Sequence, residues 1–297
     1  GVVGMGTLAT VSNNNITSNI IVLNPIADRN YGAGILDCDG LIKDNLIAGN
    51  QGARLAGGLA DCDGVILNNV IENNTAVESA AGLFNCQSEI RGNIIRGNRA
   101  TRSAGGGLNA CNGLIIENII EENEALAGGG LADCYGRIEK NLIRNNEAGG
   151  QGGGLYRCNG EIINNLVVGN VAGSYGCGIT YSSATMQNNT FYGNEAGVGG
   201  GGISSSQASI KNCISWGNLP DDIAGSNPPA YSCVGVGDLG AGSISGDPML
   251  ADPAEGDFHL TEESPCVDAG GNVAGLDEDY EGNPRPFDIG TSSRGAG

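Results

Sequence analysis

Aromatic residues, positive charge and histidine are all scarce in this sequence of 297 residues. Aromatic residues make up only 4%, so the core must be a narrow stack of aliphatic side chains. The 14 lysine and arginine residues are outnumbered by 33 acidic residues, and the net charge of −19 argues against nucleic acid as a partner. An acidic polysaccharide would also be repelled unless a metal ion bridged the charges. His259 is the only histidine, and its segment DFHL offers no partner for a zinc site.

Long apolar runs are missing as well. No stretch of about 18 apolar residues exists, which argues against membrane insertion. The first residues, GVVGMGTLATV, lack the positive charge of a secretory signal, and the start without methionine suggests a processed chain. Proline is nearly absent from the first 218 residues, because eight of the nine prolines follow Asn218.

What the sequence does contain is a repeat. Eight copies align on an aliphatic residue that follows a glycine, with steps of 24, 24, 25, 23, 24, 24 and 24 residues. The aliphatic residues are Ile35, Leu59, Leu83, Leu108, Leu131, Leu155, Ile179 and Ile203. Three residues later come Cys38, Cys62, Cys86, Cys111, Cys134, Cys158, Ser182 and Ser206. Asparagine recurs ten residues after the aliphatic position in seven copies and fifteen residues after it in all eight.

This repeat predicts an all-β fold, a right-handed parallel β-helix (solenoid) with about 24 residues per coil. Its apolar stretches are short, rich in β-branched residues and separated by Gly and Asn, so none is long enough for an amphipathic helix. Equivalent residues would stack about 4.8 Å apart, the spacing of paired strands. The Leu, Ile and Cys columns should fill the interior. The Gly column should mark a corner where a Cβ would collide or φ is positive. The Asn columns should mark bends, where Asn adopts the left-handed conformation and its amide bonds the amides of the coils above and below.

The period divides the chain into two parts. Residues 1–218 should form the parallel β-helix, with a degenerate first coil over residues 1–30 and eight regular coils over residues 31–218. In the first coil, Ile16, Asn19, Ile21 and Asn24 repeat the spacing of the later coils. Residues 219–297 should form irregular closing coils and a C-terminal cap, or a separate small domain.

Two segments resemble known families. The repeat GGGL…C.G.I..N.I…N is similar to repeats of the polymorphic outer-membrane protein family. The ending, GDPMLADPAEGDFHLTEESPCVDAGGN followed by DYEGNPRPFDIG, resembles secreted bacterial β-helix proteins of the "choice-of-anchor" type. The resemblance implies a parallel β-helix and an extracellular or cell-surface location, and it implies no activity.

Acidic residues gather near the cysteine turn. Asp37 and Asp61 fall in one column and Asp39 and Asp63 in the next. Carboxylates in neighbouring coils repel unless they share a cation, so these four are candidate calcium ligands. The alternative is a solvated turn that suits Asp for backbone reasons. No other cofactor is indicated.

An enzyme is the second interpretation. A polysaccharide lyase or glycoside hydrolase would need carboxylates together with a basic residue in a groove. Arg91, Arg96, Arg99 and Arg102 cluster by sequence, but each has a different offset in its coil. The motif GVGDLG, which starts at Gly235, lacks the following helix of a dinucleotide site. The sequence therefore indicates no catalytic residue and favours a protein that is not an enzyme, with the carbohydrate-active enzyme kept as the alternative.

We therefore expect an extracellular structural or adhesive protein. Its partners would be further copies of the chain, stacked end to end through the apolar, uncharged start, or a glycan, the latter bound with the help of calcium in the alternative interpretation. Six of the ten cysteines should be buried thiols, whereas Cys233 and Cys266 lie outside the column and could form a disulfide.

Overall fold

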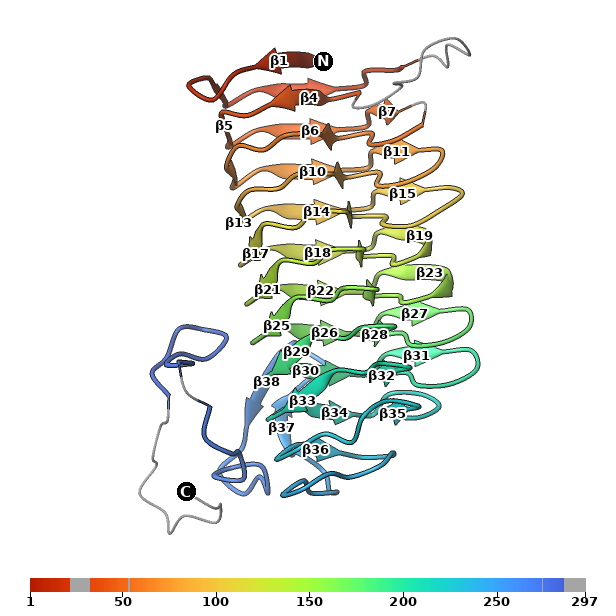
Figure 1. The fold of residues 1–297 in the computed structure, drawn as a ribbon, viewed down its shortest axis with the longest axis vertical. Helices are drawn as coiled ribbons and strands as arrows, with labels where there is room; N and C mark the ends of the chain where they lie inside the picture. Colours follow the sequence, from red (N-terminus) through yellow and green to blue (C-terminus); the bar gives the residue numbers. More distant parts are fainter. Residues whose placement is uncertain (22–32, 53, 274, 286–297) are drawn as a thin grey trace.

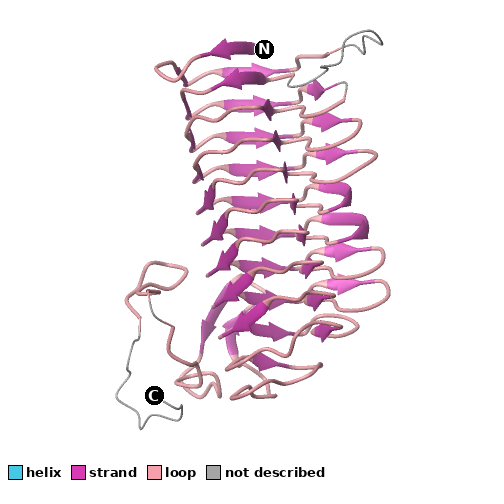
Figure 2. Ribbon diagram, in the orientation of Figure 1, coloured by secondary structure: helices cyan, strands magenta, loops and turns pink. Residues whose placement is uncertain are grey.

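A computed structural model describes residues 1–21, 33–52, 54–273 and 275–285. In this part of the chain the regular elements are all strands (Figure 2). The chain winds into a stack of coils, each passing through up to four short strands, with the N-terminus at one end of the stack (Figure 1). The predicted parallel β-helix is thereby confirmed. Among the described residues, no helix could span a bilayer.

Equivalent strands of successive coils pair in parallel and form four long sheets. Sheet A contains β1 (Val2–Met5), β4 (Ile35–Cys38), β8 (Leu59–Ala60), β12 (Leu83–Phe84), β16 (Leu108–Asn109), β20 (Leu131–Ala132), β24 (Leu155–Tyr156), β28 (Ile179–Thr180), β32 (Ile203–Ser204) and β35 (Ile223–Ala224). Sheet B contains β2 (Thr10–Ser12), β5 (Leu41–Lys43), β9 (Ile66–Leu67), β13 (Ile90–Arg91), β17 (Leu114–Ile116), β21 (Arg137–Glu139), β25 (Glu161–Ile163), β29 (Thr185–Gln187) and β33 (Ser209–Lys211).

The other two sheets complete each coil. Sheet C contains β3 (Asn15–Thr17), β6 (Leu46–Ala48), β10 (Val70–Glu72), β14 (Ile94–Arg96), β18 (Ile119–Glu121), β22 (Leu142–Arg144), β26 (Leu166–Val168), β30 (Thr190–Tyr192), β34 (Ile214–Trp216) and β36 (Cys233–Val234). Sheet D contains β7 (Gln51–Gly52), β11 (Thr75–Ala76), β15 (Arg99–Ala100), β19 (Glu124–Ala127), β23 (Glu147–Gln151), β27 (Val171–Ala172) and β31 (Glu195–Ala196). An antiparallel hairpin of β37 (Leu250–Asp252) and β38 (Asp257–Leu260) follows.

The core is a set of stacked columns, as the repeat predicts. In one central coil, Leu131 of sheet A, Ile138 of sheet B and Ile143 of sheet C are all fully buried. Sheet D contributes a smaller residue, Ala148. The register is constant, since Ile138 pairs with the equivalent isoleucines of the coils before and after it. Each coil therefore buries its apolar side chains against copies of themselves.

The glycine column is explained by close contact between coils. A Cβ added to Gly130 would lie 2.7 Å from the carbonyl oxygen of Gly154, and one added to Gly58 would lie 2.5 Å from that of Gly82. These glycines do not have positive φ. Of the two expected reasons, steric collision is therefore the one that applies.

The asparagine columns lie at the corners between sheets, and of the two expected reasons for them the amide ladder is confirmed and the left-handed conformation is wrong. The left-handed residue is the one before each column asparagine, such as Asn145, whose φ is 52°. Asn146 itself is fully buried and uses its amide to join neighbouring coils. The corner thus separates two tasks that we had assigned to one residue: the preceding residue adopts the left-handed conformation, and the column asparagine supplies the hydrogen bonds.

The first coil has a different register from the one we expected. Val11 pairs with Ile42, and Ile16 pairs with Ile47 rather than with Ile42. The backbone amide of Asn19 donates to Asn50 Oδ1 at 3.1 Å. The predicted alignment was therefore wrong by five residues. The expected position at Asn24 lies outside the described residues.

The last part of the chain first continues the helix and then leaves it. Ile223 stacks on Ile203, and Cys233 on Ile214, so residues 219–245 extend the coils. Later residues lie along the flank of the helix (Figure 1). There the hairpin and the arm, the name used here for residues 275–285, run back beside the coils. Lys140 Nζ lies 2.7 Å from Glu278 Oε2, which brings residues 138 positions apart into contact. The predicted cap region thus packs on the side of the last coils as well as extending the helix.

Candidate functional site: the outer columns and the two ends

The first aspartate column lies at the turn between sheets A and B. Asp37 and Asp61 both adopt the left-handed conformation, with φ of 57° and 48°. Asp tolerates this conformation because its short side chain can bond locally. Asp61 Oδ1 also accepts a hydrogen bond from Asn85 Nδ2 at 2.6 Å. The turn geometry therefore gives a backbone reason for aspartate in this column.

The second aspartate column joins neighbouring coils. Asp39 Oδ1 accepts from the backbone amide of Asp63 at 3.3 Å, and Asp63 Oδ1 accepts from that of Gln87 at 3.1 Å. Asn112 and Tyr135 repeat this bond in later coils at 2.9 Å. Among the described residues, no three His, Cys, Asp or Glu side chains lie close enough together to hold a metal ion. The structure thus places the four calcium candidates in columns, and in the second column the carboxylates accept from backbone amides of the next coil.

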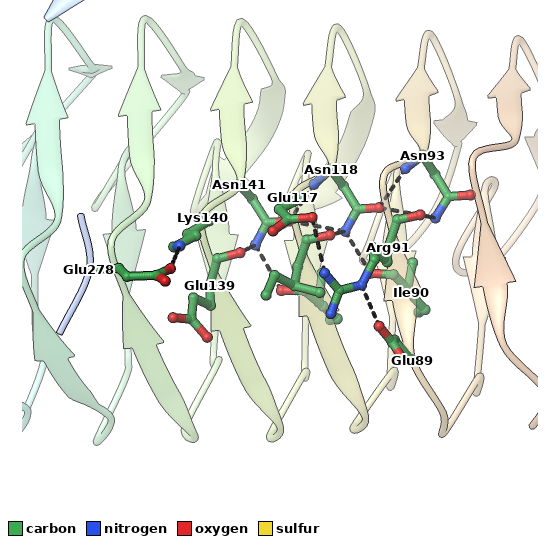
Figure 3. Close-up of polar contacts among 12 residues, drawn as sticks. Glu89, Ile90, Arg91, Asn93, Glu117, Asn118, Glu139, Lys140, Asn141 and Glu278 are labelled. Carbon is green, nitrogen blue, oxygen red and sulfur yellow. Dashed lines mark hydrogen bonds and ion pairs between the residues drawn. The ribbon is translucent and has the colours of Figure 1, made fainter. Parts of the chain in front are cut away.

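The arginine cluster does not converge on one point. Arg91 forms an ion pair with Glu89 and one with Glu117 at 3.1 Å, at the corner where Figure 3 shows it beside the asparagine ladder. Arg96 and Arg99 pair with glutamates of adjacent coils on sheets C and D. Such exposed pairs contribute little to stability, about 0–1 kcal/mol each. They do place opposite charges in register along the outside of the helix.

The cysteine column is buried, as expected, and all ten cysteines are free thiols. The thiol of Cys134 donates to the backbone carbonyl of Ala132 at 3.3 Å, so its only polar group is satisfied. Burial raises the pKa of Cys177 to about 12, which keeps that thiol protonated and unreactive. Cys233 and Cys266 lie in contact, and the hydrogen bond between them, followed by burial, raises the pKa of Cys233.

One functional position was missed by the sequence analysis. Asp222 ends the second asparagine ladder: its Oδ1 accepts from the backbone amide of Asn218 at 3.0 Å and from Asn218 Nδ2 at 2.7 Å. Its Oδ2 accepts from the amide of Val236 at 2.7 Å. Burial raises the pKa of this carboxyl above its ordinary value. An acidic residue just after the last ladder asparagine was the available signal.

The N-terminal end of the helix presents three edge strands, β1, β2 and β3. Leu41 N donates to Ala9 O, and Asn13 N donates to Lys43 O. In a parallel pair, bonding alternates along the strand, so Thr10 directs its backbone groups to the outer edge. The same coil exposes Leu8 completely and Val3 by 65%. An unpaired edge beside exposed aliphatic side chains is a template for another chain.

The last layer of the helix exposes aliphatic residues too. Val236 is 55% and Leu239 45% exposed, and both belong to the segment that lies under the coil of β35. The backbone amide of Ile223 donates to the carbonyl of Val236, which fixes this segment as the next layer. The two ends of the stack therefore both carry apolar side chains next to β-structure.

His259 connects the hairpin to the arm. Its Nδ1 lies 2.6 Å from Asp257 Oδ1, and its Nε2 lies 3.1 Å from Glu281 Oε2. The Glu281 carboxylate, and then that of Asp257, raise the pKa of His259 above its ordinary value of 6.5. Because the folded pKa lies above the unfolded one, the stability from these contacts is complete below pH 6.5 and is lost as the pH rises through the raised pKa.

We therefore expect the arm to loosen on mild alkalinisation. Hydrogen exchange of residues 275–285, corrected for intrinsic rates, should be faster at about pH 8.5 than at about pH 6. His259→Gln should remove most of this difference. Equal protection of residues 275–285 at both pH values would contradict the role of His259 in holding the arm.

Comparison of the chain with protein-family models, with curated proteins and with solved structures finds no match. The class of protein is therefore defined by the fold, a parallel β-solenoid with asparagine ladders.

Proposed function

We propose that the protein is an extracellular structural or adhesive element whose β-helix assembles end to end. The observation that carries this proposal is the pair of ends: edge strands with exposed Leu8 and Val3 at one, and exposed Val236 and Leu239 at the other. Two different surfaces of the same chain make a heterologous contact, which produces an open filament unless it closes into a ring.

The stack of regular coils between the two ends, called the shaft from here on, supports a mechanical role. Its coils are joined by backbone ladders and by continuous side-chain ladders, such as the bonds from Asn123 to Asn146 and from Asn146 to Asn170. Such a stack resists bending because neighbouring coils are hydrogen-bonded in all four sheets and along the asparagine ladders. The extracellular location rests on the resemblance of the repeat and of the closing segment to secreted and surface β-helix proteins. The closing Asp288-Ile289-Gly290 lies outside the described residues.

Sedimentation and electron microscopy across a concentration series test the assembly. We expect particles that lengthen with concentration in steps of one helix length. Leu8→Asp puts a charge into the proposed contact and should weaken association about tenfold or more. Leu126→Asp is the matched control, since Leu126 is 55% exposed in sheet D and away from both ends. A particle that stays monomeric at the highest concentration would overturn the proposal, as would equal association of the two variants.

A further inference from the structure

A cavity lies where the hairpin packs on the flank of the helix. It has a volume of about 360 Å³ and opens between the outer face of sheet C and the segment that contains β37. Figure 1 shows this segment beside the last coils. The volume falls within the range of about 300–1,000 Å³ that is typical of small-molecule sites, which often occur where two structural units meet. The residues that carry the proposed end-to-end contact, such as Val236 and Leu239, do not line this cavity.

Two aromatic side chains form one wall. Tyr192 and Trp216 are register partners on the adjacent strands β30 and β34, so they stand side by side on the outer face of sheet C. The Trp216 ring lies close over Gly235, where an added Cβ would be 3.0 Å from Cε3. The Tyr192 ring is held by an edge contact with Phe258, with the ring centroids 5.6 Å apart. Both rings are therefore fixed before any ligand binds, which lowers the entropic cost of binding.

The opposite wall supplies polar groups. Asp247 is the only charged residue that lines the cavity within the described chain, and its Oδ1 accepts from the Met249 amide at 2.8 Å. Thr261 Oγ1 is buried and has no hydrogen-bond partner among the described residues. Met249 is 40% exposed. An unpaired buried hydroxyl in a native structure calls for an explanation, and a bound ligand is one.

We propose that this cavity binds a neutral saccharide. The C–H face of a pyranose ring is apolar and stacks on the electron-rich face of Tyr or Trp. Its hydroxyls are both donors and acceptors, so one can donate to the Asp247 carboxylate and another can pair with the free Thr261 hydroxyl. No Lys or Arg lines the cavity within the described chain, and Asp247 repels anions. A phosphate or a uronate would therefore be disfavoured, whereas a neutral sugar meets every group present.

The fluorescence of Trp216 can report ligand binding, because Trp216 is the only tryptophan in the chain. The unmodified protein is titrated with cello-, manno-, galacto- and N-acetylchito-oligosaccharides, and with oligogalacturonate as the anionic comparison. We expect at least one neutral oligosaccharide to change the tryptophan emission in a saturable way and oligogalacturonate to have no effect. No saturable change with any neutral oligosaccharide would overturn the proposal. Equal binding of oligogalacturonate would overturn the charge argument and the ligand class with it.

Variants then locate the binding. Calorimetry with the best oligosaccharide should show that Trp216→Ala raises Kd about tenfold or more. Thr261→Val keeps the reporter and should raise Kd about fivefold or more, since it removes one hydrogen bond. Tyr175→Ala is the control: Tyr175 is 42% exposed and does not line the cavity. If both cavity variants bind as tightly as the control, with melting curves that show all three folded, the site is wrong. Filament length in the same samples reports separately on the proposed assembly.

Discussion

Ile138→Asp is expected to lower the free energy of unfolding by about 3–5 kcal/mol. Ile138 is fully buried in sheet B and stacks between Ile115 and Ile162. A carboxylate at this point has only aliphatic neighbours in its column and no partner for its charge. Urea denaturation followed by circular dichroism measures the change.

The shape of the transition is a second readout. Because each coil of a solenoid contacts only its neighbours, a damaged central coil separates the stack into two halves. We therefore expect a broader transition, or two steps, in place of one cooperative unfolding. Leu126→Asp adds the same charge at a 55% exposed site and should change stability by less than about 0.5 kcal/mol. Indistinguishable denaturation curves for the two variants would mean that the Ile138 column does not form the core.

The fold could be predicted because its interactions repeat. A residue such as Leu131 keeps its identity in each copy since it packs on its own equivalents, Leu108 and Leu155. Periodicity alone therefore shows which columns face inward. It does not show which residue of a corner adopts the left-handed conformation, because Asn145 and Asn146 are the same residue type with opposite tasks. That distinction depends on backbone geometry, which a repeat of side chains does not encode.

Features that break the period were harder to predict. The first coil lacks the spacing signal, so Val11 was not recognised as the partner of Ile42. The contact of Lys140 with Glu278 joins residues far apart in the sequence, and nothing in either segment specifies the other. The cavity next to Trp216 arises from this same packing of the tail on the shaft. A site formed by contacts between a non-repeating and a repeating segment cannot be predicted from the repeat pattern, because the repeat specifies only the contacts between equivalent residues.

The calcium site at the four aspartates stays a prediction, and the structure adds a second possible reason for their columns. Asp37 and Asp61 suggested a cation site because like charges in neighbouring coils should repel. In the structure, the turn conformation favours Asp at these positions, and Asp39 and Asp63 accept hydrogen bonds from the next coil. A column of one residue type can thus reflect backbone needs or a ligand, and only the partners of its oxygens distinguish the two.

The second large effect is expected at the centre of the asparagine ladder. Asn146 Oδ1 accepts from the backbone amide and the Nδ2 of Asn123, both at 3.0 Å. Its own Nδ2 donates to Asn170 Oδ1 and to the carbonyl of Ile120, both at 2.9 Å. Asn146→Asp keeps the acceptor but loses the donor, and it sets a buried carboxylate against two other acceptors. We expect a loss of about 3–5 kcal/mol in the free energy of unfolding.

Asn145→Asp is the matched control, because it adds the same charge to the adjacent residue, which is exposed and left-handed. Asp44 already occupies such a corner with a φ of 54°, so this variant should stay within about 0.5 kcal/mol of the parent. Equal destabilisation of the two variants, measured by urea denaturation, would contradict the ladder's role.

The asparagine ladder has a direction, and this direction predicts how the effect of Asn146→Asp depends on pH. Each asparagine accepts through Oδ1 from the coil before it and donates to the coil after it, so an acceptor-only side chain fits only where no further donation is required. Asp222 occupies that terminal position, where its Oδ1 accepts from both the backbone amide and the Nδ2 of Asn218. Inside the ladder, a carboxyl can fulfil the donor role only when it is protonated. Burial raises the pKa of such a carboxyl, so the loss in the free energy of unfolding caused by Asn146→Asp should become smaller as the pH falls. If that loss is the same at every pH, hydrogen-bond donation from this position is not what holds the coils together.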